Sequence, residues 1–158
     1  MDVSVAALTA CSGFLIAILW MDLIFDTQVH PHRRLAELPE PVLASIADYY
    51  RRATTTSRPM GHLIAVVMAT QLVTLALRVL GGADPGWLSA FAITLAAISI
   101  VLALSHTVPN AIRLGRRAGS PAVQTRRARS VLVDHVVCLV CQLIFLGLWL
   151  IASSSLLA

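Results

Sequence analysis

Long apolar stretches dominate the chain, and four of them are long enough to cross a membrane. Residues 3–25, 60–80, 87–105 and 131–152 are mostly apolar, and each approximates the ~20 residues that a helix needs to span the hydrocarbon core of a bilayer. That core has no water to satisfy backbone polar groups, so each stretch is predicted to be helical. We expect a single all-α domain over residues 1–158, an integral membrane, antiparallel bundle of four transmembrane helices with cytoplasmic helical extensions.

The first two connections between these spans differ in kind. Residues 81–86, Gly-Gly-Ala-Asp-Pro-Gly, are typical of a tight turn. Residues 41–56 are predicted to form an amphipathic cytoplasmic helix, because Pro41 suits its first position and the apolar residues that follow approximate one face. This helix either lies along the lipid headgroups or covers the inner end of the bundle.

The connection between the third and fourth spans is also predicted to be helical. Ser120 and Pro121 begin a helix that continues without a break into the fourth span, which therefore projects into the cytoplasm. Pro109 interrupts the helix that continues from the third span. Because proline removes a backbone hydrogen bond and frees the carbonyl four residues earlier, here that of Ser105, we expect a kink beside His106.

Arginines are concentrated in two of the three connections. The chain is only 13% charged, where a soluble domain has about 25%, and this composition argues against a soluble enzyme. Cytoplasmic loops carry the excess of positive residues, so both Arg-rich connections are predicted to be cytoplasmic, with both termini outside an inner membrane. Of the twelve arginines, only Arg78 is expected at the outer end. The others are Arg33, Arg34, Arg51, Arg52, Arg58, Arg113, Arg116, Arg117, Arg126, Arg127 and Arg129.

The expected partners follow from this charge distribution. Anionic lipid headgroups are the ordinary ligands of arginines at a membrane surface. No aromatic or recognition motif accompanies the arginines, so nucleic acid is not expected as a partner. A homo-oligomer or a larger membrane complex is compatible with a bundle of this size.

Acidic and imidazole side chains lie at one level, near the cytoplasmic end of all four spans. The spacing of four between Asp22, Asp26 and His30 places them on one stripe of a continuous helix. Asp134 and His135 are neighbours on the fourth span and point about 100° apart. The candidate ligands of a metal ion in this layer are Asp22, Asp26, His30, His62, His106, Asp134 and His135.

This layer supports several functional hypotheses. Facing helices build metal sites in bundle cores, and mixed His and Asp ligands suit Fe, Cu, Mn or Zn. Such a site would act on a lipid-like or quinone-like substrate, by redox or hydrolytic chemistry if it is catalytic. The alternatives are haem b held by His62 with His106 or His135, a structural ion-pair layer in a non-catalytic subunit or assembly factor, and a proton- or ion-translocating oligomer.

Other polar residues of the spans are assigned no function. Cys138 and Cys141 form a CxxC that resembles the one in a transmembrane helix of the vitamin K epoxide reductase family. The second cysteine pair that this chemistry needs is missing, since Cys11 is the only other cysteine, and we interpret the CxxC as packing residues. Gln71 and Gln142 lie nearer the middle of the membrane and are predicted to pair across helices.

Overall fold

The structure, a computed structural model, describes residues 2–56 and 58–155, apart from the side chains of residues 55, 56, 58 and 153–155. Arg58, one of the arginines assigned to the cytoplasm, therefore has its side chain outside the described part. All regular elements in the described ranges are helical, so the all-α class is confirmed. In chain order they are α1 (Val3–Asp26), η1 (Thr27–His32), α2 (Glu40–Arg51), η2 (Arg52–Thr56), α3 (Arg58–Leu80), α4 (Gly86–Leu102), η3 (Ala103–Thr107), α5 (Val108–Gly115) and α6 (Pro121–Ser155).

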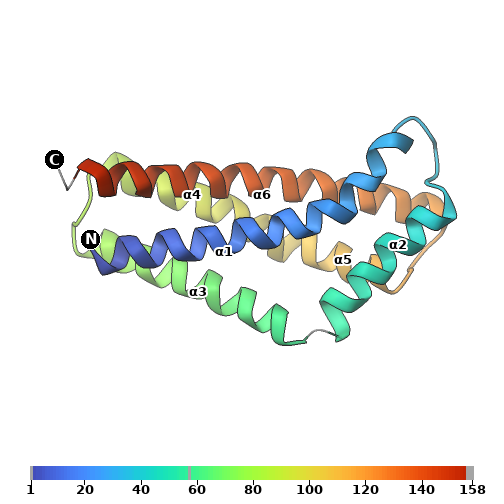
Figure 1. Cartoon of the computed structure of the whole chain (residues 1–158), viewed down its shortest axis with the longest axis horizontal. Coiled ribbons are helices and arrows are strands. Elements are labelled where there is room, and N and C mark those ends of the chain that lie inside the picture. The colour runs from blue at the N-terminus through green and yellow to red at the C-terminus, as the bar shows by residue number, and fades with distance from the viewer. Residues whose placement is uncertain (1, 57, 156–158) are drawn as a thin grey trace.

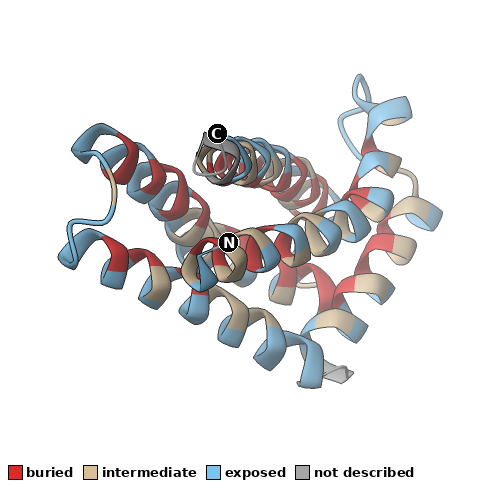
Figure 2. Cartoon of the chain, turned by 60° about the vertical axis from the view of Figure 1, so that its left-hand side comes forward, coloured by how far each residue is buried: buried red, intermediate tan, exposed pale blue. Residues whose placement is uncertain are grey.

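Within the described residues, four helical stretches are long and apolar enough to cross a membrane. Buried residues make up at most 33% of the most apolar window of each stretch, so most residues of these windows are partly or fully exposed. Exposed positions cover the outward faces of the helices, and buried positions lie between the helices (Figure 2). The four stretches are Val3–His32, Pro59–Leu80, Gly86–Gly115 and Pro121–Ala152.

Helix α6 is the longest element and organises the packing. Helices α1 and α4 both pack along α6, and α3 packs along α1 (Figure 1). Helix α3 meets α4 over a much smaller area than it meets α1. The N-terminus, the α3–α4 turn and the last turns of α6 lie together at what we call the termini end, and η1, α2 and α5 lie at the opposite, loop end (Figure 1).

Two separate apolar clusters fill the interior. The cluster at the termini end consists of Val5, Leu8, Leu75, Leu88, Ala92, Leu95, Ala96, Cys141, Phe145 and Trp149. The cluster at the loop end consists of Leu23, Val29, Leu38, Leu43, Ile46, Tyr50, Ala111, Leu114, Ala128, Val131 and Leu132. Most of the polar residues discussed below lie between these two clusters along the helices.

Arg78 holds the termini end together from the inside. Its buried guanidinium donates two hydrogen bonds, of 2.8 and 2.6 Å, to Asp84 in the α3–α4 turn and another to Asp2. It also lies 5.1 Å from the centroid of the Trp149 ring on α6. The contact with Arg78 lowers the pKa of Asp2 to about 2. A single cation therefore joins the N-terminus, the turn and α6, with two carboxylates to balance its charge.

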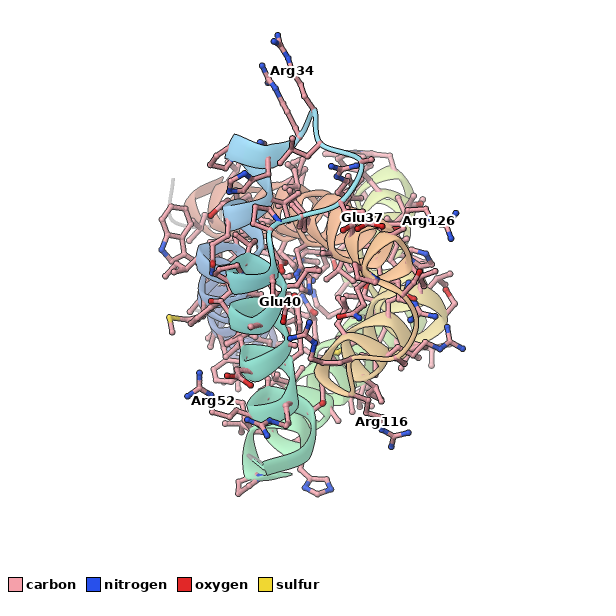
Figure 3. All side chains as sticks on the ribbon, turned by 90° about the vertical axis from the view of Figure 1, so that its right-hand side faces the viewer. Arg34, Glu37, Glu40, Arg52, Arg116 and Arg126 are labelled. Atoms are coloured by element: carbon pink, nitrogen blue, oxygen red, sulfur yellow. The ribbon has the colours of Figure 1, made fainter. Side chains whose placement is uncertain are left out.

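At the loop end, in contrast to the buried and paired Arg78, most arginines are exposed. Arg34, Arg52, Arg116 and Arg126 are exposed and point away from the helices (Figure 3). Arg117 forms an ion pair of 2.7 Å with Glu40 at the start of α2, and its guanidinium lowers the pKa of that carboxyl. The counter-charges for most of these exposed arginines must therefore come from outside the protein.

Helix α2 covers the loop end of the bundle, one of the two arrangements predicted from its amphipathic pattern. Leu43, Ile46 and Tyr50 on its apolar face are buried. Its close approach to α5 depends on Gly115, because a Cβ atom there would lie 2.7 Å from the backbone nitrogen of Arg51 and 3.0 Å from its Cα. Main chain meets main chain at this point, so neither side has a flexible group that can move away.

We therefore expect Gly115→Ala to separate α2 from α5. Overpacking of a rigid contact costs about 1–3 kcal/mol, so the unfolding temperature of the protein in detergent should fall. Gly13→Ala is the matched control, since a Cβ atom at Gly13 would have no described atom within 4 Å beyond its own helix. That variant should unfold at the wild-type temperature or above it, because alanine favours the helix by up to about 1 kcal/mol. Equal unfolding temperatures for the two variants would contradict the proposed close contact.

Candidate functional site

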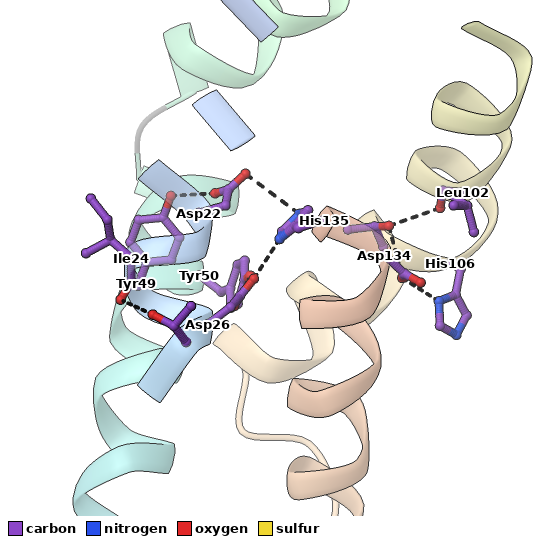
Figure 4. A network of polar contacts seen from close by, with 11 residues as sticks. Asp22, Ile24, Asp26, Tyr49, Tyr50, Leu102, His106, Asp134 and His135 are labelled. Carbon is purple, nitrogen blue, oxygen red and sulfur yellow. Dashed lines mark hydrogen bonds and ion pairs between the residues drawn. The ribbon is translucent and has the colours of Figure 1, made fainter. Parts of the chain in front are cut away.

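His135 lies between two carboxylates of α1 (Figure 4). Its Nδ1 is 2.6 Å from Oδ2 of Asp26, and its Nε2 is 3.7 Å from Oδ2 of Asp22. An ionised carboxylate only accepts hydrogen bonds, so Nδ1 carries the hydrogen in the contact with Asp26. In the neutral imidazole, Nε2 is then an acceptor whose lone pair faces the side of Asp22.

Two tyrosines of α2 complete this arrangement, which we call the His135 centre (Asp22, Asp26, Tyr49, Tyr50 and His135). The Tyr49 hydroxyl donates to Oδ1 of Asp22 at 2.5 Å, and the Tyr50 hydroxyl donates to Oδ1 of Asp26 at 2.6 Å. Asp26 is fully buried, and each of its oxygens has one of these partners. The centre thus joins α1, α2 and α6.

Sequence reasoning placed Tyr49 and Tyr50 on the amphipathic cytoplasmic helix and did not include them in the site. The signal for Tyr50 was present in the pattern, because it follows Leu43 and Ile46 by seven and four residues on the apolar face of α2. Tyr49 lies beside that face, and its ring stacks on Phe25 at 4.0 Å between centroids.

A second acid–imidazole pair lies on the other side of α6. Nδ1 of His106 is 2.6 Å from Oδ2 of Asp134, and the Thr107 hydroxyl donates to the same oxygen at 3.1 Å. Asp134 is buried, whereas the His106 side chain is 45% exposed. Asp134 and His135 therefore contribute to different clusters, as the predicted 100° between neighbouring helix positions requires.

The predicted irregularity beside His106 takes the form of a wide, π-helical turn. In η3 the backbone N–H of Val108 donates to the carbonyl of Ala103, five residues earlier. The Thr107 hydroxyl donates to the carbonyl of Leu102 at 3.2 Å as well as to Asp134. Such turns accommodate a missing hydrogen bond like that of Pro109, and they are frequent at functional sites.

The structure divides the seven predicted metal ligands into three sets. Asp22, Asp26 and His135 meet in one cluster, and His106 and Asp134 meet in another. His30 and His62 are exposed and form no hydrogen bond or ion pair with either cluster in the described part of the chain.

The prediction that His30 continues the stripe of Asp22 and Asp26 is wrong. Helix α1 ends at Asp26, and residues 27–32 form a 3₁₀ helix that contains Pro31. A 3₁₀ helix turns 120° per residue instead of 100°, so four residues after Asp26 the chain faces another direction. His62 has the expected depth, at the start of α3, but lies on an exposed face of that helix.

Among the described residues, no group of three or more His, Cys, Asp or Glu side chains is arranged to hold a metal ion. Binding of Fe, Cu, Mn or Zn therefore stays a prediction. The same applies to haem b, for which iron would have to displace Asp22 from beside Nε2 of His135.

An apolar pocket of about 160 Å³ begins at the His135 centre. Its walls come from α1, α3, the α4–η3 segment and α6, and the pocket is partly open to the outside. Asp22 and His135 line it toward the loop end, and Gln71 and Gln142 line it toward the middle of the helices. Cys138 also lines it, with its thiol 3.8 Å from the carbonyl oxygen of Ser99. The pocket thus has apolar walls and a small number of polar groups, which is typical of a ligand site.

Comparisons with family models, with curated proteins and with solved structures found no match for this chain. The site must therefore be interpreted from its own chemistry.

The two tyrosines provide a direct test of the His135 centre. Burial and the neighbouring carboxylates Asp22 and Asp26 raise the pKa of both phenols well above that of free tyrosine. A group with a raised pKa in the fold stabilises it fully below its unfolded pKa, here about 10, and this contribution is lost as the pH rises through the folded value.

We expect no phenolate absorbance from the folded protein at pH values where free tyrosine is ionised. The chain has only these two tyrosines, so absorbance at alkaline pH monitors this site alone. Phenolate should form only together with loss of helical circular dichroism, and protein unfolded in denaturant should titrate near the free value. Ionisation near pH 10 with full helicity retained would show that the phenols do not bind the carboxylates.

Proposed function

We propose that the chain is a multi-pass inner-membrane protein, an antiparallel four-helix bundle with both termini outside and the loop end in the cytoplasm. Two observations support this. The outward faces of the four long helices are apolar, which suits lipid rather than water. The exposed arginines lie at the loop end, whereas Arg78 at the other end is buried and paired. The free arginines suit anionic lipid headgroups at the cytoplasmic surface.

We further propose that the protein binds a hydroxyl-bearing, lipid-like or quinone-like amphiphile from the bilayer and accepts a proton from it at His135. The observation that carries this proposal is that His135 and Asp22 both line an apolar pocket, while Asp26 binds Nδ1 of His135 and leaves Nε2 on the side of Asp22. The alkyl tail of the ligand would leave the pocket between α3 and α4, the neighbouring spans with the least mutual contact.

The chemistry of the proton transfer follows from this arrangement. Asp26 fixes the tautomer and orientation of the imidazole, as a carboxylate partner does for catalytic histidines. When the ligand hydroxyl donates to Nε2, its O–H bond breaks and the electron pair stays on the ligand oxygen. The positive charge that forms on His135 is offset by Asp22 and Asp26 on either side. Tyr49 and Tyr50 stay neutral donors and hold the two carboxylates in place.

Binding of 2-decylphenol to the purified protein, measured by calorimetry in detergent, tests this proposal. His135→Gln removes a charge-assisted interaction worth about 1.5–3 kcal/mol, so affinity should fall about 10- to 100-fold. His62→Gln is the matched control and should bind as the wild type does. Asp22→Asn is a second variant in case His135→Gln does not fold, and it should also weaken binding. A wild-type protein without affinity, or a folded His135→Gln variant with unchanged affinity, would overturn the proposal.

A metal ion is the second candidate at the same centre, and one observation favours it. The 3.7 Å between Nε2 of His135 and Oδ2 of Asp22 is compatible with an ion bound to both atoms at about 2.0–2.2 Å each. Asp26 would then be the carboxylate that orients a metal-bound histidine. A redox-active ion of this kind could supply electrons for chemistry on a quinone-like substrate.

Elemental analysis of the purified protein tests the metal candidate. If the centre binds a metal ion, the wild-type protein should contain a stoichiometric amount of Fe, Cu, Mn or Zn. This metal should be lost in His135→Ala and retained in His62→Ala. Metal-free wild-type protein, or metal retained by a folded His135→Ala variant, would exclude this candidate and leave the amphiphile proposal intact.

A further inference from the structure

We propose that the deep end of the pocket is a second polar subsite, formed by Gln71 and Gln142, that selects ligands with oxygens on opposite edges of one ring. The ligand class is thus a 1,4-dihydroxybenzene with an alkyl tail. This inference rests on the proposed binding of an amphiphile at His135 and names the class of that amphiphile.

The two buried amides leave hydrogen-bonding capacity unused. Nε2 of Gln71 donates to Oε1 of Gln142 at 3.2 Å, and the Ser12 hydroxyl donates to the same oxygen at 2.8 Å. Gln71 is 2% and Gln142 is 4% exposed. The carbonyl of one amide and the NH₂ group of the other form no hydrogen bond within the described part of the chain. This conclusion does not depend on which end of each amide is oxygen, because one N–H···O bond between two amides always leaves one carbonyl and one NH₂ group.

A few polar groups on the wall of an otherwise apolar pocket are what orients a bound ligand. Both glutamines line the pocket, so a ligand in the pocket is the partner that can reach them. Since a donor and an acceptor are both present, the subsite can bind either a hydroxyl or a carbonyl oxygen.

The spacing between the two polar ends fits one ring. His135 and Gln142 are seven residues apart on the same face of α6, which is about 10 Å along the helix axis. A ring with oxygens on opposite edges, together with a hydrogen bond of about 3 Å at each end, has a length of about 11 Å, close to this axial distance. The volume of about 160 Å³ is also adequate, since a cavity of about 150 Å³ admits benzene.

The experiment compares 2-decylhydroquinone with 2-decylphenol, which lacks the second hydroxyl, on the wild-type protein and on the Gln71→Leu/Gln142→Leu double variant. The wild type should bind the hydroquinone about tenfold more tightly than the phenol, as one extra hydrogen bond in a buried site predicts. The double variant should bind both ligands with equal affinity, close to that of the wild type for the phenol. The Ser12 hydroxyl keeps its contact with the main-chain oxygen of residue 142 in that variant.

Two further variants complete the design. Gln71→Leu alone leaves Gln142 bound to Ser12, and it should lose part of the preference if the double variant does not fold. Gln28→Leu, which changes a glutamine outside the pocket, should keep the full tenfold preference. Equal binding of both ligands by the wild type, or a preference that persists in the double variant, would overturn the second subsite. If the wild-type protein binds neither ligand, the proposed function itself is overturned.

Discussion

The buried carboxylate of Asp26 is the constraint on which the rest of the structure depends. An ionised group with no access to water must be paired and hydrogen-bonded, and Asp26 has one partner for each oxygen, Tyr50 and His135. These partners belong to α2 and α6, while Asp26 belongs to α1. The position of α2 over the loop end and the orientation of the His135 ring therefore follow from one requirement, and the glycine contact between α2 and α5 makes it geometrically possible.

Polar groups join the helices at three levels, of which the His135 centre is the one nearest the loop end. Arg78 joins the N-terminus, the α3–α4 turn and α6 at the termini end. Ser12, Gln71 and Gln142 join α1, α3 and α6 near the middle. Apolar packing between long smooth helices tolerates sliding and rotation, whereas a directional hydrogen bond does not. The three levels thus fix the register of the helices and give the pocket a defined shape.

The sequence was sufficient to predict the four long helices, the turn between the second and third, and the depth of the ionisable layer, because each depends on local periodicity. It also separated Asp134 from His135, since neighbours on a helix point about 100° apart. It could not predict which residues at the same depth meet. His62 lies on an exposed face at the start of α3, and the local pattern does not specify which face of that helix meets the bundle. Tyr49 and Tyr50 reach the site through the tertiary position of α2, which no local pattern specifies.

The two ends of the bundle differ in what lies between the helices. At the termini end, Phe145 and Trp149 are fully buried in an apolar cluster, and the Arg78 contacts close that end. Toward the loop end, by contrast, the pocket reaches ionisable groups, and α3 separates from its neighbour α4. The proposed ligand would therefore reach the His135 centre from the side of the bundle, between α3 and α4, and not through the termini end.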